Sequence, residues 1–205
     1  MCGRFTLTDP VRINARYPRY RFEEFSEHRL PRFNIAPTQA VLGVRNDGKN
    51  EVIPLEWGID GRINARVETV ASRPLPFRCI IFADGFYEWR GRKPVYYTMK
   101  DGRVFAFAGI WNPVAQGPTT CAIVTCPPNE LVARVHDRMP AILSDDDLDA
   151  WLTERDMAPA LARTLIQPYD ASGMEARDVS MRLNDARNDS PNVLVDDDPV
   201  QRSLF

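Results

Sequence analysis

The residues with the most distinctive chemistry stand at the N-terminus. The chain begins Met1-Cys2-Gly3-Arg4. A small residue after the initiator permits removal of Met1, which would leave the α-amine and thiol of Cys2 on adjacent carbons. An aldehyde can condense with this amine to an imine, and the thiol can then close a thiazolidine ring. Both groups have a reactive fraction near neutral pH, because their unperturbed pKa values are roughly 8 and 8.5. The ring closure is intramolecular, which lowers its barrier. We predict that Cys2 attacks a carbonyl carbon; the alternative is an incidental cysteine.

Four further stretches place polar side chains in strand-like or turn-like contexts. They are Arg32-Phe-Asn34-Ile-Ala-Pro37-Thr38, Ile63-Asn64-Ala-Arg66-Val-Glu68-Thr69, Ala83-Asp-Gly85-Phe-Tyr-Glu88-Trp89 and His136-Asp137-Arg138-Met139-Pro140. A carboxylate and an imidazole can move the protons that imine formation requires without a metal or other cofactor. Each residue also has a structural interpretation. Glu88 can be the exposed position of an alternating strand and His136 part of a salt-bridged turn, while Asn34 and Asn64 can serve turns or helix caps.

Together with the N-terminal motif, these stretches resemble the SRAP family, the SOS response-associated peptidases or abasic-site-processing proteins. The resemblance runs from Cys2 to about residue 143, includes Trp57-Gly58 and Gly109-Ile110-Trp111, and resumes at Val179-Ser-Met-Arg-Leu-Asn184-Asp-Ala-Arg-Asn188. It implies one SRAP domain over residues 1–190 with a barrel-like sheet core. Only Ile59 to Ile63 separates Gly58 from Asn64, whereas the family usually has a longer segment here. This difference puts a preference for DNA junctions in doubt.

The resemblance implies a role for each matching residue. Cys2 would form the crosslink to DNA, Asn64 would hydrogen-bond the sugar, and Glu88 and His136 would be general acid–base groups. Phosphates would be held by Arg4, Arg66 and Arg73, and a base would stack on Trp89. The resemblance also places Asn34 and Pro37 in the DNA-binding pocket.

The predicted function is covalent capture of ring-opened abasic sites in single-stranded DNA, which shields the lesion. Strand cleavage by β-elimination would be a side activity wherever the imine persists. One alternative is a thiol autopeptidase with Cys2 as nucleophile, but only Met1 precedes Cys2. Another is a non-catalytic single-strand binder, which would not need Cys2 at the terminus. No cofactor or metal is expected, and the sequence gives no oligomeric state.

Charge is unevenly distributed along the 205 residues, although the net charge is only -2. Residues 1–35 hold seven arginines against four acids, residues 62–104 hold nine basic against four acidic residues, and residues 144–205 hold six basic against fourteen acidic residues. Such segments can give a polarised surface or an ordinary mixed one. Neither a signal peptide nor a membrane span is expected, so we predict a cytoplasmic protein that joins the nucleoid on binding DNA. The cysteines should be free thiols.

Hydrophobic patterning predicts an α+β domain with mainly antiparallel strands and peripheral helices. Hairpins are expected for 41–45 with 51–57, around Asn46-Asp47-Gly48, and for 95–99 with 104–108, around Asp101-Gly102. Buried strands are expected at 79–83 and 121–126. Three helices are expected. The first should start at Asp9-Pro10, the second should run from an N-cap at Ser144 to about Glu154, and the third should span residues 159–166. Residues 191–205 are expected to form a mobile acidic tail.

Overall fold

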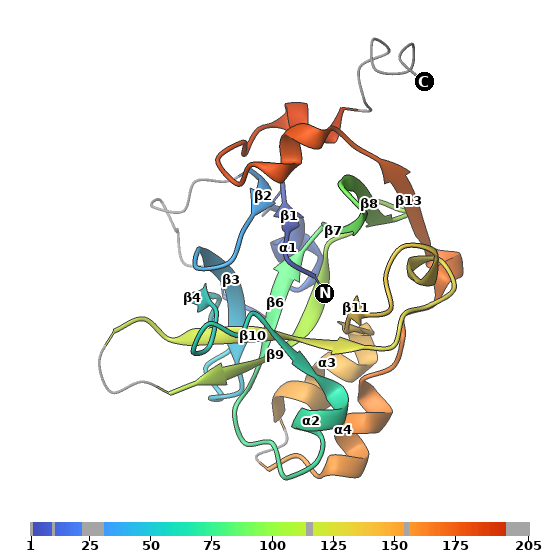
Figure 1. Ribbon diagram of the computed structural model, residues 1–205. Helices are drawn as coiled ribbons and strands as arrows, with labels where there is room; N and C mark the ends of the chain where they lie inside the picture. Colours follow the sequence, from blue (N-terminus) through green and yellow to red (C-terminus); the bar gives the residue numbers. More distant parts are fainter. Residues whose placement is uncertain (1, 10, 22–30, 114–116, 154–155, 196–205) are drawn as a thin grey trace, which may run out of the picture.

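The computed structural model describes residues 2–9, 11–21, 31–113, 117–153 and 156–195. Two sheets share one hydrophobic core, and short helices lie at the periphery (Figure 1). The strands are β1 (Phe5–Leu7), β2 (Arg32–Ile35), β3 (Ala40–Arg45), β4 (Ile53–Trp57), β5 (Asn64–Arg66), β6 (Arg78–Ala83), β7 (Gly85–Arg90), β8 (Lys93–Met99), β9 (Phe105–Asn112), β10 (Thr120–Cys126), β11 (Met139–Pro140), β12 (Ile142–Leu143) and β13 (Met174–Asp178). The helices are α1 (Val11–Arg16), α2 (Val67–Val70), α3 (Asp145–Thr153) and α4 (Pro159–Leu165), with 3-10 turns η1 (Val132–Arg134), η2 (Ala171–Gly173), η3 (Met181–Asn184) and η4 (Pro191–Leu194).

The larger sheet closes on itself. Its strands follow the order β10-β4-β3-β6-β9, and β9 pairs with β10 again, so that these five strands form a ring. The pairings of β10 with β4 and β5 are parallel, and the others in this sheet are antiparallel. The second sheet is wholly antiparallel, in the order β13-β8-β7-β1-β2. The α+β class with a barrel-like, mainly antiparallel core is therefore confirmed.

Aromatic side chains join the two sheets. Phe5 of β1 packs edge-on against Trp57 of β4 and Phe107 of β9, with ring centroids 5.1 and 5.6 Å apart. Phe86 of β7 also contacts Phe107, at 6.3 Å. Edge-to-face pairs at these distances add about 0.5–1.5 kcal/mol each beyond the burial of their area. The core thus fixes β1 and β7, the strands that flank the N-terminal motif, against the ring.

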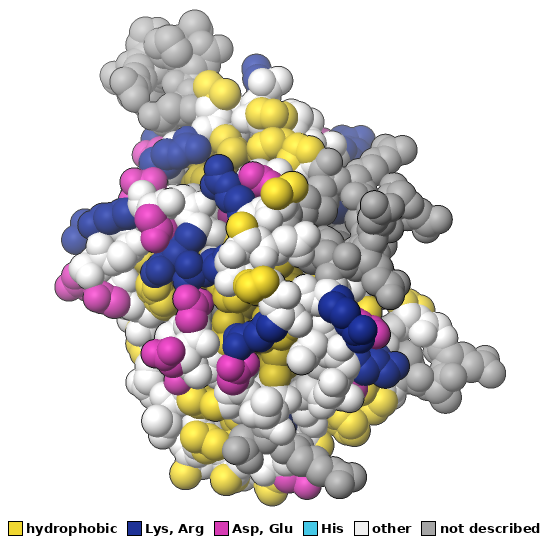
Figure 2. Space-filling model, turned by 180° about the vertical axis from the view of Figure 1, so that it is seen from behind, with side chains coloured by type: hydrophobic (Ala, Val, Ile, Leu, Met, Phe, Trp, Pro, Cys, Tyr) yellow, Lys and Arg dark blue, Asp and Glu magenta, His cyan; other side chains and the backbone are white. Residues whose placement is uncertain are grey.

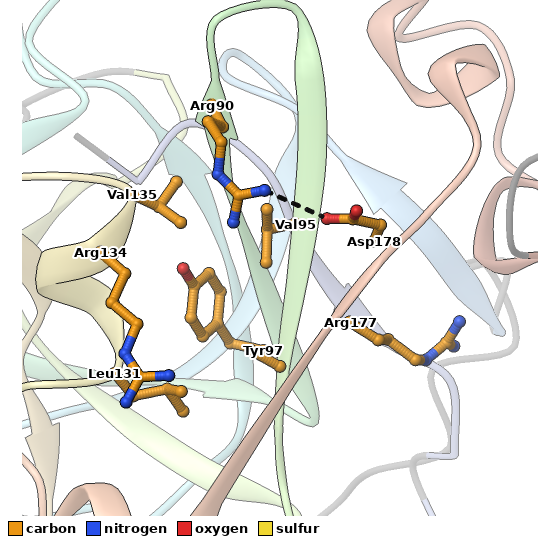
Figure 3. A pocket seen from close by; sticks show the side chains of 9 residues that line it. Arg90, Val95, Tyr97, Leu131, Arg134, Val135, Arg177 and Asp178 are labelled. Carbon is orange, nitrogen blue, oxygen red and sulfur yellow. Dashed lines mark ion pairs between the residues drawn. The ribbon is translucent and has the colours of Figure 1, made fainter. Parts of the chain in front are cut away.

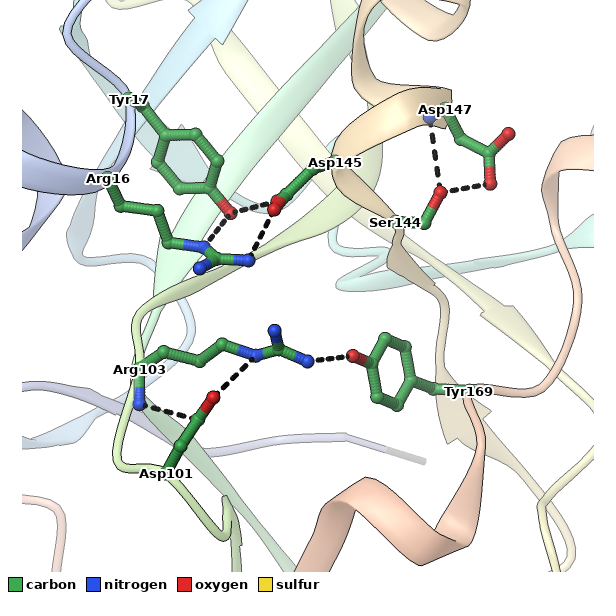
Figure 4. A network of polar contacts seen from close by, with 8 residues as sticks. All are labelled: Arg16, Tyr17, Asp101, Arg103, Ser144, Asp145, Asp147 and Tyr169. Atoms are coloured by element: carbon green, nitrogen blue, oxygen red, sulfur yellow. Dashed lines mark hydrogen bonds and ion pairs between the residues drawn. The ribbon is translucent and has the colours of Figure 1, made fainter.

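Most predicted elements are confirmed. The hairpin around Asn46-Asp47-Gly48 forms as β3 and β4, the strands at 79–83 and 121–126 form as β6 and β10, and the helices at 145–153 and 159–165 form as α3 and α4. Asp9 caps the start of α1, because its carboxylate accepts a hydrogen bond from the Val11 backbone N–H at 3.0 Å. Pro10 lies outside the described residues. Ser144 caps α3 by accepting from the Asp147 N–H at 3.2 Å (Figure 4).

The second predicted hairpin is wrong. A turn does form at Asp101-Gly102, where the Gly102 N–H donates to the Met99 carbonyl at 2.9 Å. The two strands then part, because β8 pairs with β7 and β13 in one sheet while β9 pairs with β6, β10 and β12 in the other. The turn signal was local, and pairing was decided by partners distant in sequence.

The predicted mobile tail is also wrong for its first residues. Residues 191–194 form η4, and Val193 is buried in a small cluster with Tyr87, Tyr96, Val179 and Leu183. Residues 196–205 lie outside the described part. The burial of Val193 extends the packed C-terminal segment to residue 194.

The acidic C-terminal third neutralises the basic N-terminal segment instead of polarising the surface. Arg16 pairs with Asp145 at 2.5 Å (Figure 4). Arg19 pairs with Asp149 at 2.5 Å, and Arg32 pairs with Asp189. The face opposite to the view of Figure 1 shows basic and acidic side chains interspersed (Figure 2). In the part of the chain that the structure describes, no helix has both the length and the apolar character needed to cross a membrane.

Candidate functional site

Pairing of β1 with β7 places the N-terminal motif beside Glu88. Phe5 lies opposite Phe86, and the Tyr87 N–H donates to the Arg4 carbonyl at 3.1 Å, so the chain before Arg4 continues along Glu88. Asp84 fixes this arrangement: its carboxylate accepts hydrogen bonds from the Thr6 hydroxyl at 2.5 Å and the Thr8 N–H at 2.6 Å. Asp84 belongs to the motif that contains Glu88, but its role in holding β1 beside β7 was not predicted.

Asn64 holds the N-terminal motif from the other side. It opens β5, which runs parallel to β10, and its side-chain Nδ2 donates to the Cys2 carbonyl at 2.9 Å. Its Oδ1 is buried and accepts no hydrogen bond from the described residues. A buried acceptor without a donor is costly, and a ligand hydroxyl could supply that donor. The geometry therefore fits the sugar contact predicted for Asn64.

Glu88 is buried, against the alternative that it is the exposed position of a strand. It is 1% exposed and lies on the face of β7 that also carries Phe86. The pKa of Glu88 is raised to about 7, mainly by burial and to a smaller extent by the charge of Asp137. A carboxyl with a pKa near 7 is present in both protonation states at neutral pH, which suits a group that must both accept and donate a proton.

His136 lies in the loop between η1 and β11, next to the Asp137 that influences Glu88. Its Nδ1 accepts a hydrogen bond from the Arg138 backbone N–H at 3.0 Å and also lies 3.0 Å from Asp137 Oδ1. A neutral ring that accepts the Arg138 bond carries its proton on Nε2, whereas a protonated ring pairs with Asp137. Burial lowers the pKa of His136, although Asp137, 3.0 Å away, opposes this. The imidazole is therefore mainly neutral at pH 7.

The Cys2 thiol is protonated in this environment. Cys2 is completely buried, and its Sγ donates weakly to the Arg4 carbonyl at 3.7 Å. Burial raises the pKa of Cys2 well above its ordinary value, and the neighbouring Glu88 carboxylate raises it as well. Cys79, Cys121 and Cys126 are also buried free thiols, as predicted, but they lie within the sheets. The structure thus gathers Cys2, Asn64 and Glu88 with the His136 loop.

An ion pair between the buried Arg138 and the exposed Glu68 connects the His136 loop to α2, and it was not predicted. Arg138 donates Nη1 to Glu68 Oε1 at 2.6 Å and Nη2 to Glu68 Oε2 at 3.0 Å, and Nη2 also donates to the Thr125 carbonyl at 2.5 Å. Arg138 lowers the pKa of Glu68. Glu68 lies in α2, two residues after the end of β5. Both residues belong to motifs identified in the sequence. Their pairing could not be predicted, because they are 70 residues apart in the chain.

A pocket of about 580 Å³ borders Asn64 and contains two of the predicted phosphate-binding residues. Arg66 and Arg73 line it, and so does Arg62, which was not predicted. All three are exposed, none forms an ion pair with a described residue, and no acidic residue lines the pocket. Unpaired cations around a concave surface favour an anionic ligand.

Arg4 provides a further cation at the N-terminal motif. Its Nη1 donates to the Gly3 carbonyl at 3.0 Å, and among the described residues no carboxylate lies within ion-pair distance. Partial burial lowers the pKa of Arg4. A partly desolvated guanidinium without a counter-ion is suited to bind a phosphate.

Asn34 does not line a binding pocket, so its predicted role is wrong. It is completely buried, and its Nδ2 lies 3.0–3.1 Å from the carbonyls of Leu183, Asp185 and Asn188. The backbone N–H of Asn34 donates to Asp189 at 2.8 Å. Asn34 therefore fastens the C-terminal segment to β2.

Trp89 and Pro37 are not brought to the group around Cys2 by any contact. Trp89 points from the face of β7 opposite to Glu88, packs against the small cluster that contains Val193, and donates Nε1 to Asn184 Oδ1 at 2.7 Å. Pro37 is half-buried in the turn after β2. Base stacking by Trp89 and a DNA contact by Pro37 stay predictions.

Comparison with known proteins agrees with this fold and with the motifs. The profile of the SOS response associated peptidase (SRAP) family matches residues 1–186. The chain therefore belongs to the SRAP family. A crystal structure of a protein from Bacteroides thetaiotaomicron superposes with a TM-score of 0.81 at 23% identity, covering 96% of this chain and all of that one.

Curated relatives match between 58% and 95% of the chain. The abasic site processing protein YoqW of Bacillus subtilis is 38% identical, and the match covers 95% of this chain and 99% of YoqW. The abasic site processing protein YedK of Escherichia coli is 30% identical over 75% of this chain and 80% of its own length. The abasic site processing protein HMCES of Gallus gallus is 33% identical, over 58% of this chain and 43% of HMCES.

Proposed function

We propose that this protein processes abasic sites by capturing them in single-stranded DNA, through a covalent bond to the α-amine and thiol of Cys2. The names of its curated relatives support abasic site processing as the task. The observation that carries the chemistry is the position of Cys2, enclosed between Asn64 and the buried Glu88. Removal of Met1 is part of the proposal, since only then is the amine of Cys2 free.

The reaction balances with the loss of one water. The amine of Cys2 attacks the aldehyde carbon of the ring-opened sugar and gives a carbinolamine. A proton donated to its hydroxyl lets water leave, and an imine remains. The thiol then adds to the imine carbon while its proton passes to the nitrogen, which closes the thiazolidine. Neither an oxidant nor a reductant is needed.

The residues around Cys2 match these proton transfers. Glu88, with its pKa near 7, can take a proton from the attacking amine and return it to the departing hydroxyl. The neutral His136 can donate its Nε2–H to the sugar oxygen as the ring opens. Asn64 can accept a hydrogen bond from a sugar hydroxyl at its unpaired Oδ1. Phosphates of the strand would lie on Arg66 and Arg73.

The protonated state of the Cys2 thiol counts against a thiol peptidase. A peptidase nucleophile is activated as a thiolate, which requires a lowered pKa, whereas burial raises that of Cys2. Addition to an imine can proceed with the proton delivered to nitrogen in the same step. We therefore place capture ahead of autoproteolysis.

Incubation of the processed protein with a single-stranded oligonucleotide that bears one abasic site tests the proposal. We expect a heat-stable adduct whose mass equals protein plus DNA minus one water, located on Cys2 by peptide mass spectrometry. Cys2→Ala should abolish the stable adduct and retain noncovalent binding. An adduct located on a lysine, or a stable Cys2→Ala adduct, would refute the thiazolidine chemistry. Loss of all binding in Cys2→Ala would mean that the variant is misfolded, which circular dichroism detects.

A further inference from the structure

A second pocket shares no lining residue with the arginine-lined pocket at Asn64. Its volume is about 330 Å³. Its walls come from β8, from the end of β7, from β13 and from the segment that leads into the His136 loop (Figure 3). This volume is at the lower end of the range of about 300–1,000 Å³ that is typical of small-ligand sites. None of the predicted site residues lines this pocket.

The pocket contains a buried hydroxyl that lacks a partner. Tyr97 is completely buried, its ring stacks on Phe86 with centroids 4.9 Å apart, and its hydroxyl forms no hydrogen bond with any described residue. In Figure 3 this hydroxyl points into the space between Arg90 and Val135. A buried hydroxyl without a partner destabilises a fold, so an oxygen-bearing ligand would compensate for its cost.

Two cations border the same space. Arg134 is exposed and forms no ion pair with a described residue. Arg90 lies 3.9 Å from Asp178, but the other oxygen of Asp178 is already 2.7 Å from the ammonium of Lys93. The acid is thus neutralised by Lys93, and the pocket retains positive charge. The guanidinium of Arg177 does not add to this charge, because it lies over the Tyr96 ring and donates to the Leu194 carbonyl.

The residues that line the pocket are neighbours of two of the groups proposed to move protons, Glu88 and His136. Glu88 and Arg90 occupy alternate positions on β7, so their side chains leave the same face. Strand pairing places Glu88 opposite Val95 and Phe86 opposite Tyr97, which makes Tyr97 a diagonal neighbour of Glu88. Val135 directly precedes His136. A strand bound at Cys2 would therefore reach this pocket with an adjacent nucleotide.

We propose that this pocket binds the nucleotide next to the abasic site, on the side opposite to the phosphates held by Arg66 and Arg73. The phosphate would lie between Arg90 and Arg134, and the Tyr97 hydroxyl would donate to an oxygen of the phosphate or sugar. The apolar side chains of Val95, Leu131 and Val135 would contact the sugar and base. The inference rests on the proposed function, since it assigns a second contact of the same strand.

Oligonucleotides of three designs test this assignment: the lesion at the centre, at the 5′ end or at the 3′ end. The wild type should crosslink about tenfold faster when the nucleotide that fills the pocket is present. Arg134→Ala and Tyr97→Phe should remove that advantage, and Tyr97→Phe retains the ring that stacks on Phe86. Arg163→Ala, an exposed arginine of α4, is the control and should keep the advantage.

Noncovalent binding gives a readout that does not depend on the crosslink. Fluorescence anisotropy with an undamaged single strand should show weaker binding by Arg134→Ala than by Arg163→Ala. If both readouts leave Arg134→Ala and Tyr97→Phe equal to wild type while the Cys2 adduct forms, the pocket assignment is wrong and the capture function stands. If free deoxynucleoside monophosphate binds the pocket but neither strand readout changes, the pocket serves a free nucleotide and the assignment to the strand is also wrong. If no adduct forms but anisotropy depends on Arg134, capture fails and the pocket remains a strand contact.

Discussion

At the level of single residues, Glu88 combines deep burial with an ionisable group that the proposed chemistry needs. Its folded-state pKa is about 7, against 4.5 for the free carboxyl. Because the folded state favours the protonated form, Glu88 does not oppose folding below about pH 4.5. Its ionisation costs stability progressively as the pH rises through 7, by at most about 3 kcal/mol for a shift of this size. The burial that gives Glu88 a pKa suited to proton transfer therefore lowers the free energy of unfolding at neutral pH.

We predict that Glu88→Gln stabilises the protein at pH 8 and has little effect at pH 5, because glutamine cannot ionise. The same variant should crosslink at least about a hundredfold more slowly, since it removes a general acid–base group. Thermal unfolding at the two pH values and the rate of adduct formation measure both effects. A stability difference that does not change between pH 5 and pH 8 would contradict the raised pKa.

The residue types of this site were readable from the sequence, but their environments were not. The residue types and their order in the sequence predict chemistry on a carbonyl group; these residues are Met1-Cys2, Asn64, Glu88 and His136. Alternation along β7 suggested an exposed Glu88, because a pattern in one strand does not reveal that a second element covers its polar face. Asn34 was misassigned for a related reason: its partners lie about 150 residues away.

At the level of elements, the ion pair of Arg138 with Glu68 connects α2 to the His136 loop. Arg138 also donates to β10 through the Thr125 carbonyl. Three parts of the structure, α2, β10 and the His136 loop, are thereby connected by one guanidinium. We infer that Arg138 is a positioning residue for His136, since its own backbone N–H also fixes the tautomer of the ring.

We predict that Glu68→Gln lowers the free energy of unfolding by about 1 kcal/mol or less, because Glu68 is exposed and Arg138 keeps its hydrogen bond to the Thr125 carbonyl. Crosslinking should slow as well, with its pH profile shifted where His136 titrates. Glu130→Gln, an exposed acid in the neighbouring segment, serves as the control. Chemical denaturation and a pH–rate profile are the measurements, and an unchanged profile in a destabilised variant would reduce the pair to a purely structural role.

The C-terminal segment is a second element whose importance was underestimated. It is fastened by Asn34 and by Asp189, which accepts from the Phe33 and Asn34 N–H groups and pairs with Arg32. The motif at 184–188 therefore has a structural role in this chain.

We predict that Asn34→Ala destabilises the protein by about 2–3 kcal/mol, because buried carbonyls lose their donor. Below its melting temperature, the variant should still crosslink abasic DNA at close to the wild-type rate. Differential scanning fluorimetry and the adduct assay test the two statements. Full stability combined with lost crosslinking would restore the pocket role that the structure denies.

At the level of the whole molecule, internal pairing decides which cations are left for a ligand. Of the seven arginines in residues 1–35, Arg12, Arg16, Arg19, Arg21 and Arg32 pair with acids, and Arg29 lies outside the described residues. Arg4 remains, next to Cys2. Counts of basic and acidic residues in each segment overstated the basic surface, because they do not show which charged side chains form ion pairs after folding.

We predict that binding to undamaged single-stranded DNA weakens linearly in a double-logarithmic plot against salt. Arg66→Ala and Arg73→Ala should each lower the slope by about 0.7, since each removes one phosphate contact. Arg19→Ala, whose partner is Asp149, should leave the slope unchanged. Affinities measured by anisotropy across a salt series decide the matter, and equal slopes in all three variants would exclude this pocket as the phosphate site.

The fold itself was largely predictable as a class, since strand and helix signals are local. What the sequence could not supply was the closure of the ring through β9 and β10, or the divergence of β8 and β9 after a turn. Both depend on which edges are already occupied by strands remote in sequence.

The complete enclosure of Cys2 has a consequence for the order of events during synthesis. Its enclosing partners, Asn64 and β7, leave the ribosome some sixty to ninety residues after it. Until then the fold does not cover the nascent terminus. If Met1 is removed as proposed, removal during synthesis would take place before the Cys2 side chain is enclosed.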